Sequence, residues 1–105
     1  MATPKTTDGT SDDRDSETPP EVHVEFFGIA RQLAGCESIS VEASTLADVI
    51  TALSTRFPEL GARCFRDQGL REQWLFNIEG RFIRETTFPL TADASVLLMS
   101  ADAGG

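Results

Sequence analysis

Hydrophobic and polar residues alternate in several short stretches after residue 20, and this period of two predicts β-strands with one buried face. Over Glu21–Phe27 the residues expected to face the core are Val22, Val24 and Phe26. The same alternation returns over Glu37–Val41. A connection bounded by Gly28 and Gly35 joins the two stretches. We therefore expect an antiparallel hairpin whose connection is a short turn of helix or a wide loop.

A period close to 3.6 follows, and it predicts one main helix from Thr45 to Phe57. The apolar stripe of this helix consists of Leu46, Val49, Ile50, Leu53 and Phe57. The helix should begin with a capping box, in which Thr45 and Asp48 satisfy each other's backbone amides. Pro58 should end it, because proline disfavours helical geometry in the residue before it.

The segment Glu59–Gln73 has no clear period, so we expect an irregular connection. Leu60, Cys64 and Phe65 should dock on the core from this segment, and Arg63, Arg66 and Arg71 should be solvated. A second hairpin is predicted beyond it, with Trp74–Ile78 turning at Glu79-Gly80 into Arg81–Ile83, followed by a loop that packs Phe88 and Leu90.

The last predicted strand is Ala94–Ser100, and it is apolar at every position from Val96 to Met99. Such continuity is typical of a central strand that is covered on both faces. The predicted order is therefore strand, strand, helix and three more strands. This order indicates an α+β fold with a five-stranded sheet and one main helix.

The first twenty residues contain no Val, Ile, Leu or aromatic residue, and we predict that 1–20 is a disordered acidic tail. Five acidic and two basic residues give this tail a net charge of −3, which leaves −5 of the total of −8 for residues 21–105. An acidic body disfavours binding to nucleic acid and to anionic membranes, and it is compatible with a basic protein partner.

The sequence shows neither a targeting signal nor a cysteine spacing typical of a metal site or a disulfide. No apolar run is long enough to span a membrane, and the acidic start is unlike a secretion or transit signal. Cys36 and Cys64 are separated by 28 positions and the chain has a single His, so we expect no metal site and no disulfide. These features predict a cytoplasmic protein with reduced cysteines.

The chain ends in a diglycine, which suggests a reactive terminus. Glycine loses the most conformational freedom on ordering, so Gly104-Gly105 serves structure poorly unless close approach is required. The tail over 100–105 could place the Gly105 carboxyl in another protein's active site, with Ala103 and Gly104 as the narrow segment that the partner binds. A chance sequence at a frayed terminus is the competing explanation.

The segment Phe26–Gly35 (FFGIARQLAG) resembles the opening signature of the small subunit of molybdopterin synthase, in the MoaD/ThiS family. The helix after Thr45, Asn77, the Pro89-Leu90 loop and the terminal diglycine also fall where that family places them. The resemblance covers residues 21–105. It implies a β-grasp, ubiquitin-like fold, with the first and last strands parallel at the centre of the sheet.

The resemblance also implies a sulfur carrier that is not itself an enzyme. A MoeB/ThiF-like adenylyltransferase of the ubiquitin-activating type would use ATP and Mg²⁺ to adenylate Gly105, and a persulfide donor would convert it to a thiocarboxylate. A MoaE-like large subunit would then receive the sulfur for molybdopterin, as a step of molybdenum cofactor biosynthesis. This chain would bind no cofactor, because its sequence has no Gly-rich phosphate-binding loop.

Two departures from the family pattern leave the partner open. Thr91–Ser95 replaces an acidic-Gly-Asp turn, and Ser100–Ala103 lacks the prolines that often precede the diglycine. Three alternatives therefore remain: a ThiS-like thiamine sulfur carrier, a modifier that forms isopeptide bonds through Gly105, and an interaction module with an inert tail. The Glu59–Gln73 insert favours molybdopterin over thiamine, since thiamine-type carriers are usually shorter.

Overall fold

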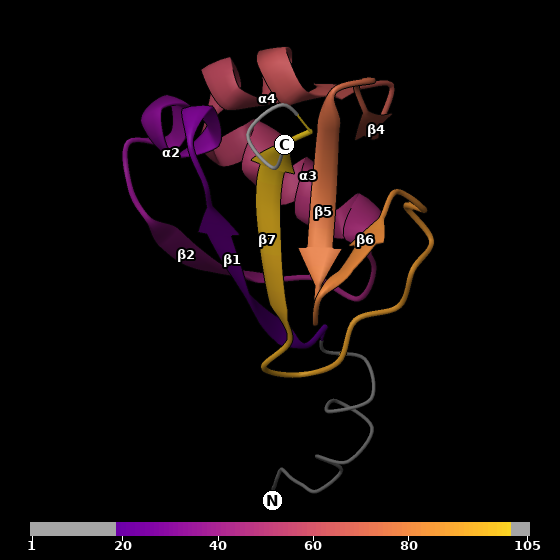
Figure 1. The fold of residues 1–105 in the computed structure, drawn as a ribbon. Helices are drawn as coiled ribbons and strands as arrows, with labels where there is room; N and C mark the ends of the chain where they lie inside the picture. The colour runs from indigo at the N-terminus through magenta and orange to yellow at the C-terminus, as the bar shows by residue number, and fades with distance from the viewer. Residues whose placement is uncertain (1–18, 102–105) are drawn as a thin grey trace, which may run out of the picture.

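The computed structural model describes residues 19–101 and shows one mixed sheet with helices against one of its faces (Figure 1). The strands of the main sheet are β1 (Glu21–Phe26), β2 (Ser38–Glu42), β5 (Trp74–Ile78), β6 (Arg81–Ile83) and β7 (Ser95–Ser100). The helices are α2 (Ile29–Ala34), α3 (Leu46–Arg56) and α4 (Pro58–Cys64). A small second sheet contains β3 (Phe65–Arg66) and β4 (Gly69–Leu70).

The strand order in the main sheet is β2-β1-β7-β5-β6, so β7 lies at the centre. β1 and β2 form the predicted antiparallel hairpin, and β5 and β6 form the second one. The turn of the second hairpin has positive φ at both Glu79 and Gly80, the backbone of a two-residue type I′ turn. β1 and β7 are parallel, so the predicted α+β fold with a five-stranded mixed sheet is confirmed.

The core lies between the sheet and α3. Leu46, Val49, Ile50 and Leu53 are all buried, as the predicted stripe requires. The capping box is present, with the Asp48 amide donating to the Thr45 hydroxyl and the Thr45 amide donating to the Asp48 carboxylate. Leu90 is buried in the predicted loop, and Phe88 packs against the core.

The prediction of an irregular segment over 59–73 is wrong, because the chain forms α4 and the β3–β4 hairpin there. Pro58 does stop α3, but it also begins α4, since proline is well tolerated in the first turn of a helix. The β3–β4 turn has positive φ at Asp67 and Gln68, neither of which is glycine. The core positions of this segment are confirmed, since Leu60, Cys64 and Phe65 are buried.

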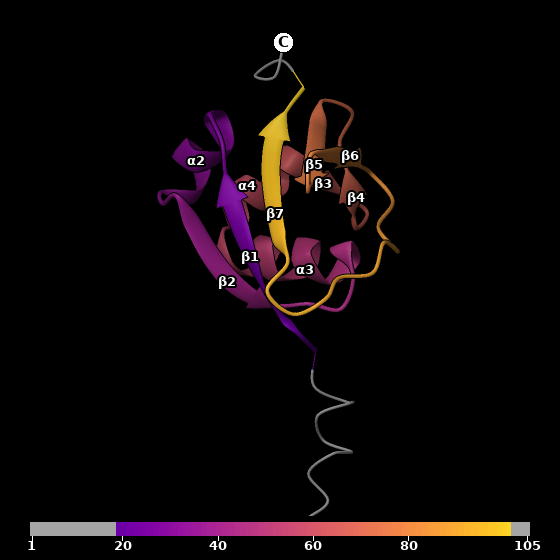
Figure 2. The ribbon, with the colours of Figure 1, turned by 60° about the horizontal axis from the view of Figure 1, so that its bottom comes forward.

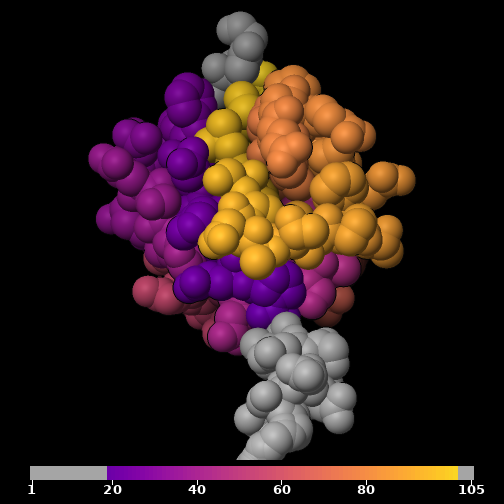
Figure 3. Space-filling model, turned by 90° about the horizontal axis from the view of Figure 1, so that it is seen from below, coloured from indigo at the N-terminus to yellow at the C-terminus, as the bar shows by residue number. Residues whose placement is uncertain are grey.

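The prediction that β7 is covered on both faces holds fully for one face only. Val96 and Leu98 are fully buried beneath the helices, whereas on the other face Met99 is 8% exposed and Leu97 is half-buried. Figures 2 and 3 show the other face of the sheet without a helix over it. The apolar run of β7 therefore faces the core on one side and is partly covered by the neighbouring strands' side chains on the other.

We predict that Leu53→Ala lowers the free energy of unfolding by about 2–5 kcal/mol, because it removes buried methyl groups and leaves a cavity. Leu53 has no exposed surface in α3. Thr51→Ala, on the exposed side of the same helix, is the matched control and should change stability by no more than about 0.5 kcal/mol. Chemical denaturation measures both values, and equal effects would contradict this packing of α3.

Candidate functional site

The parallel pairing of β1 and β7 determines where the chain ends. Val24 pairs with Val96 and Phe26 pairs with Leu98, so the two strands run in the same direction side by side. On its other edge β7 pairs antiparallel with β5, from Asn77–Leu97 to Trp74–Ser100. The strand therefore leaves the sheet at the end that is uppermost in Figure 1, opposite to the end where β1 begins.

The last described residue, Ala101, is attached to the start of β5. Its amide donates a hydrogen bond of 2.7 Å to the Gln73 carbonyl, which continues the β5–β7 pairing by one residue. Ser100 is buried within β7. The exit direction of the chain is thus set by the backbone of 73–74.

The Arg84 side chain also holds this backbone in place, through hydrogen bonds to carbonyls of residues 70–74. Its guanidinium donates to the Trp74 carbonyl at 2.5 Å, to those of Leu70 and Arg71 at 3.3 Å each, and to that of Glu72 at 3.5 Å. One side chain therefore holds the segment that positions Ala101. The role of Arg84 could not be predicted from the sequence, because its partners lie 10 to 14 positions away and no local pattern identifies it.

The three predicted site residues lie outside the described part of the chain. Gly105, whose carboxyl is expected to react, and the approach residues Ala103 and Gly104 all follow Ala101. Their expected roles therefore stay predictions. The structure locates the point from which these residues extend.

An exposed apolar surface lies on the open sheet face near this point. Phe27, which directly follows β1, is 44% exposed, and Phe82 of β6 is 60% exposed. Between them the register places the half-buried Leu75 beside the buried Met99, and Asn77 beside the half-buried Leu97. Figure 3 shows this face with β7 between β1 and β5–β6. Exposed large apolar side chains on one open face of a sheet are a feature of protein-binding surfaces.

Within residues 19–101, Cys64 and His23 are not placed as a catalytic pair, since Cys64 is buried and His23 is exposed on β1. Burial raises the pKa of the Cys64 thiol to about 12, with a smaller opposing effect of Arg63, so this thiol stays protonated and unreactive at neutral pH. His23 is exposed, and its ring Nδ1 lies 3.1 Å from the Ser40 hydroxyl. Residues 19–101 hold no group of acidic, His or Cys side chains suited to a metal ion.

Within the same residues, no helix is long and apolar enough to cross a membrane. Three features lie near the chain end: the Ala101–Gln73 pairing that sets its direction, the open sheet face with Phe27 and Phe82, and the backbone that Arg84 holds. This arrangement can present a chain terminus to another protein.

Comparison with known proteins gives a consistent result. A model of the ThiS family matches residues 24–105, which include the whole main sheet from Val24 onward and the diglycine. No curated protein matches the chain.

Several solved structures have the same fold. Small archaeal modifier protein 1 from Methanosarcina acetivorans is 22% identical, with 82% of this chain and 97% of that chain covered and a TM-score of 0.72. A Pyrococcus furiosus protein described as molybdopterin converting factor subunit 1 is 22% identical, with 77% and 97% covered and a TM-score of 0.65. A chain of the BexX/CysO complex from Amycolatopsis orientalis is 19% identical, with 80% and 99% covered and a TM-score of 0.69.

At these identities the structural neighbours establish the fold, and the family model establishes the membership. The expected β-grasp, ubiquitin-like architecture is confirmed. The chain belongs to the ThiS family and has the fold of the ThiS and MoaD type of ubiquitin-like sulfur carriers.

Proposed function

We propose that this protein carries sulfur on the carboxyl group of Gly105, as a thiocarboxylate. The observation that carries the proposal is the central β7 strand, which leads directly from the sheet toward a terminal diglycine. A strand fixed on both edges can hold the body still while the end of the chain enters another protein. The match of the ThiS model through residue 105 supports this function.

The chemistry requires activation, because a carboxylate is a poor electrophile at neutral pH. In the proposed sequence a Gly105 carboxylate oxygen attacks the α-phosphorus of ATP and displaces pyrophosphate. The terminal sulfur of a persulfide donor then attacks the acyl carbon and displaces AMP. A thiol cleaves the resulting acyl disulfide, leaving the thiocarboxylate on Gly105 and a disulfide on the donor. Covalent activation of this kind divides one difficult transfer into easier steps.

Catalysis is assigned to the partners. ATP and Mg²⁺ would be bound by a MoeB/ThiF-like adenylyltransferase, since the sequence has no Gly-rich phosphate-binding loop. The exposed Phe27 and Phe82 support docking of such a partner on the open sheet face, next to the exit point of the tail. The need for cellular ATP supports a cytoplasmic location.

We assign the sulfur to molybdopterin biosynthesis, with a MoaE-like large subunit as the receiver. The likeness to the Pyrococcus furiosus protein supports this assignment, as does the α4–β3–β4 insert, which distinguishes the chain from shorter thiamine-type carriers. A ThiS-like thiamine carrier uses the same terminal chemistry and is the nearest alternative.

A second candidate function is protein modification through an isopeptide bond from Gly105 to a lysine. The likeness to small archaeal modifier protein 1 favours it. The sequence makes this candidate easy to test, because Lys5 is the single lysine of the chain. A Lys5→Arg variant cannot conjugate to lysine on another copy of itself, so any lysine-linked conjugate it forms must contain a different protein.

Intact-mass analysis of protein isolated from its own cells tests the carrier function. We predict a population heavier by the difference between a sulfur and an oxygen atom, with the added mass located on the C-terminal peptide. Lysine-linked conjugates in place of this species would support the modifier function. An unmodified carboxyl under every growth condition would contradict both.

Changes at the diglycine should abolish transfer and leave the fold unchanged. We predict that Gly104→Ala and deletion of Gly105 each prevent sulfur loading while thermal unfolding stays as in the parent, since neither residue belongs to a described element. Ser95→Ala, at the exposed start of β7, is the control and should load normally. Unfolding of the body on truncation would show that the tail is structural instead.

A further inference from the structure

A groove of about 620 Å³ lies on the helix side of the tail exit, between α4, the β3–β4 hairpin and the start of β5. Arg63, Arg66 and Arg71 line it together with Trp74. The chain has nine basic residues against 17 acidic ones, and three of the nine gather here. This groove is therefore a local concentration of positive charge on an acidic protein.

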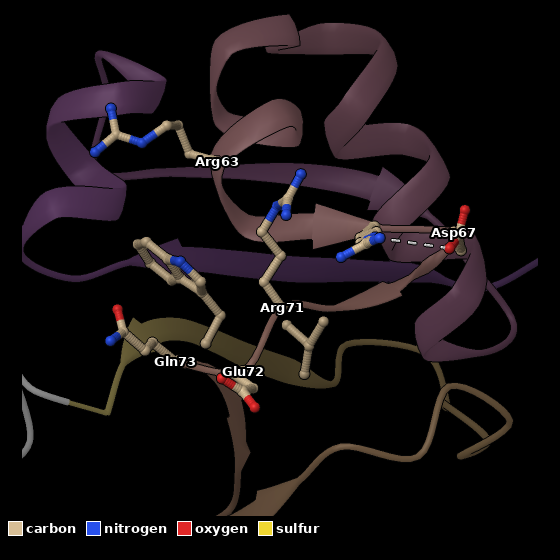
Figure 4. Close-up of a pocket in the computed structure, with 8 residues that line it drawn as sticks. Arg63, Asp67, Arg71, Glu72 and Gln73 are labelled. Carbon is tan, nitrogen blue, oxygen red and sulfur yellow. Dashed lines mark ion pairs between the residues drawn. The ribbon is translucent and has the colours of Figure 1, made fainter.

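The two acidic residues that line the groove, Asp67 and Glu72, neutralise little of the positive charge of its arginines. Figure 4 shows Arg71 pointing toward α4, whereas Glu72 points the other way. Asp67 lies 3.9 Å from the Arg66 guanidinium, but the two side chains are 93% and 73% exposed, so solvent screens the pair. Arg63 forms no ion pair within residues 19–101.

The groove is also held in shape before any partner arrives. The four carbonyls that accept from Arg84 belong to Leu70, Arg71, Glu72 and Trp74, which all line the groove. The Arg71 side chain donates from Nε to the Ala62 carbonyl at 3.1 Å, which ties the β4–β5 connection to α4. A site whose backbone is already ordered loses less entropy on binding.

The groove lies next to the point where the chain leaves β7. Gln73, another lining residue, accepts the hydrogen bond from Ala101, the last described residue before the diglycine segment. A protein that takes up the tail must therefore lie close to this groove as well as to the open sheet face.

We propose that the arginine groove binds an acidic segment of the protein that takes up the C-terminal tail. This inference rests on the proposed function for the partner's identity, and on charge complementarity for the partner's chemistry. The rest of the chain is acidic overall, which disfavours binding of such a segment elsewhere. The groove would thus orient the partner, in addition to the contacts made on the open face.

Trp74 provides a direct reporter, because it is the single tryptophan and lines the groove. The probe is a synthetic peptide of alternating Glu and Gly, titrated into the full-length protein. We expect a saturable change in Trp74 fluorescence that weakens as salt concentration rises. The same peptide with Lys in place of Glu should give no saturable change.

Paired variants separate the groove from general charge. Arg63→Ala with Arg66→Ala should weaken binding of the Glu peptide by about five- to tenfold. Arg56→Ala with Arg81→Ala makes the same change in net charge at exposed positions outside the groove and should leave the affinity within about twofold. Arg63→Glu with Arg66→Glu should reverse the preference, so that the Lys peptide binds. Thermal unfolding checks that every variant remains folded.

Three results would overturn the inference: no saturable response to the Glu peptide, equal weakening in the two alanine pairs, or tighter binding of a single-stranded oligonucleotide of the same charge. The test is independent of sulfur chemistry, since a chain lacking Gly105 should bind the Glu peptide as the parent does. If protein isolated from its own cells carries sulfur on Gly105 but does not bind the Glu peptide, the groove proposal is rejected and the carrier function stands. If the full-length protein binds the Glu peptide but never carries sulfur on Gly105 in its own cells, the carrier function is rejected and the groove proposal stands.

Discussion

The parallel pairing of β1 with β7 is the constraint on which the rest of the structure depends. Parallel neighbours cannot be joined by a tight turn, so the chain must cross back from one end of the sheet to the other between them. All the remaining elements, from α2 to β6, lie between these two strands along the chain. The last strand is thereby enclosed between β1 and β5, and its end emerges at a fixed point on the body.

In this topology the elements that form the core lie apart from the surface and the chain exit that a partner would contact. The helices cover one face of the sheet and supply the core, so the other face can keep Phe27 and Phe82 exposed without loss of packing. The exit of the chain lies near this apolar surface and beside the arginine groove, with the Arg84 brace beneath it. In the proposed function a body of this kind needs no catalytic side chain of its own, because the reacting group would be the terminal carboxyl.

Periodicity predicted the parts of the fold that repeat locally. The stripe of α3, its capping box and both hairpins of the main sheet follow from spacing and turn residues. The α4–β3–β4 segment could not be predicted in the same way. Pro58 both ends one helix and begins the next, and the turn at Asp67-Gln68 contains no glycine. The apolar run of β7 likewise did not distinguish a covered face from an exposed one.

The candidate site was only partly accessible from sequence for a similar reason. A diglycine terminus is conspicuous by composition, whereas Arg84 and the arginine groove depend on residues brought together by the fold. β7 is held by its two neighbours in the sheet, β1 and β5, and should not need the tail that follows it. Amide hydrogen exchange of β7 can be compared between the full chain and a chain ending at Ala101. We expect equal protection of Val96–Ser100 in both chains, and weaker protection in the shortened chain would show that the tail holds the strand.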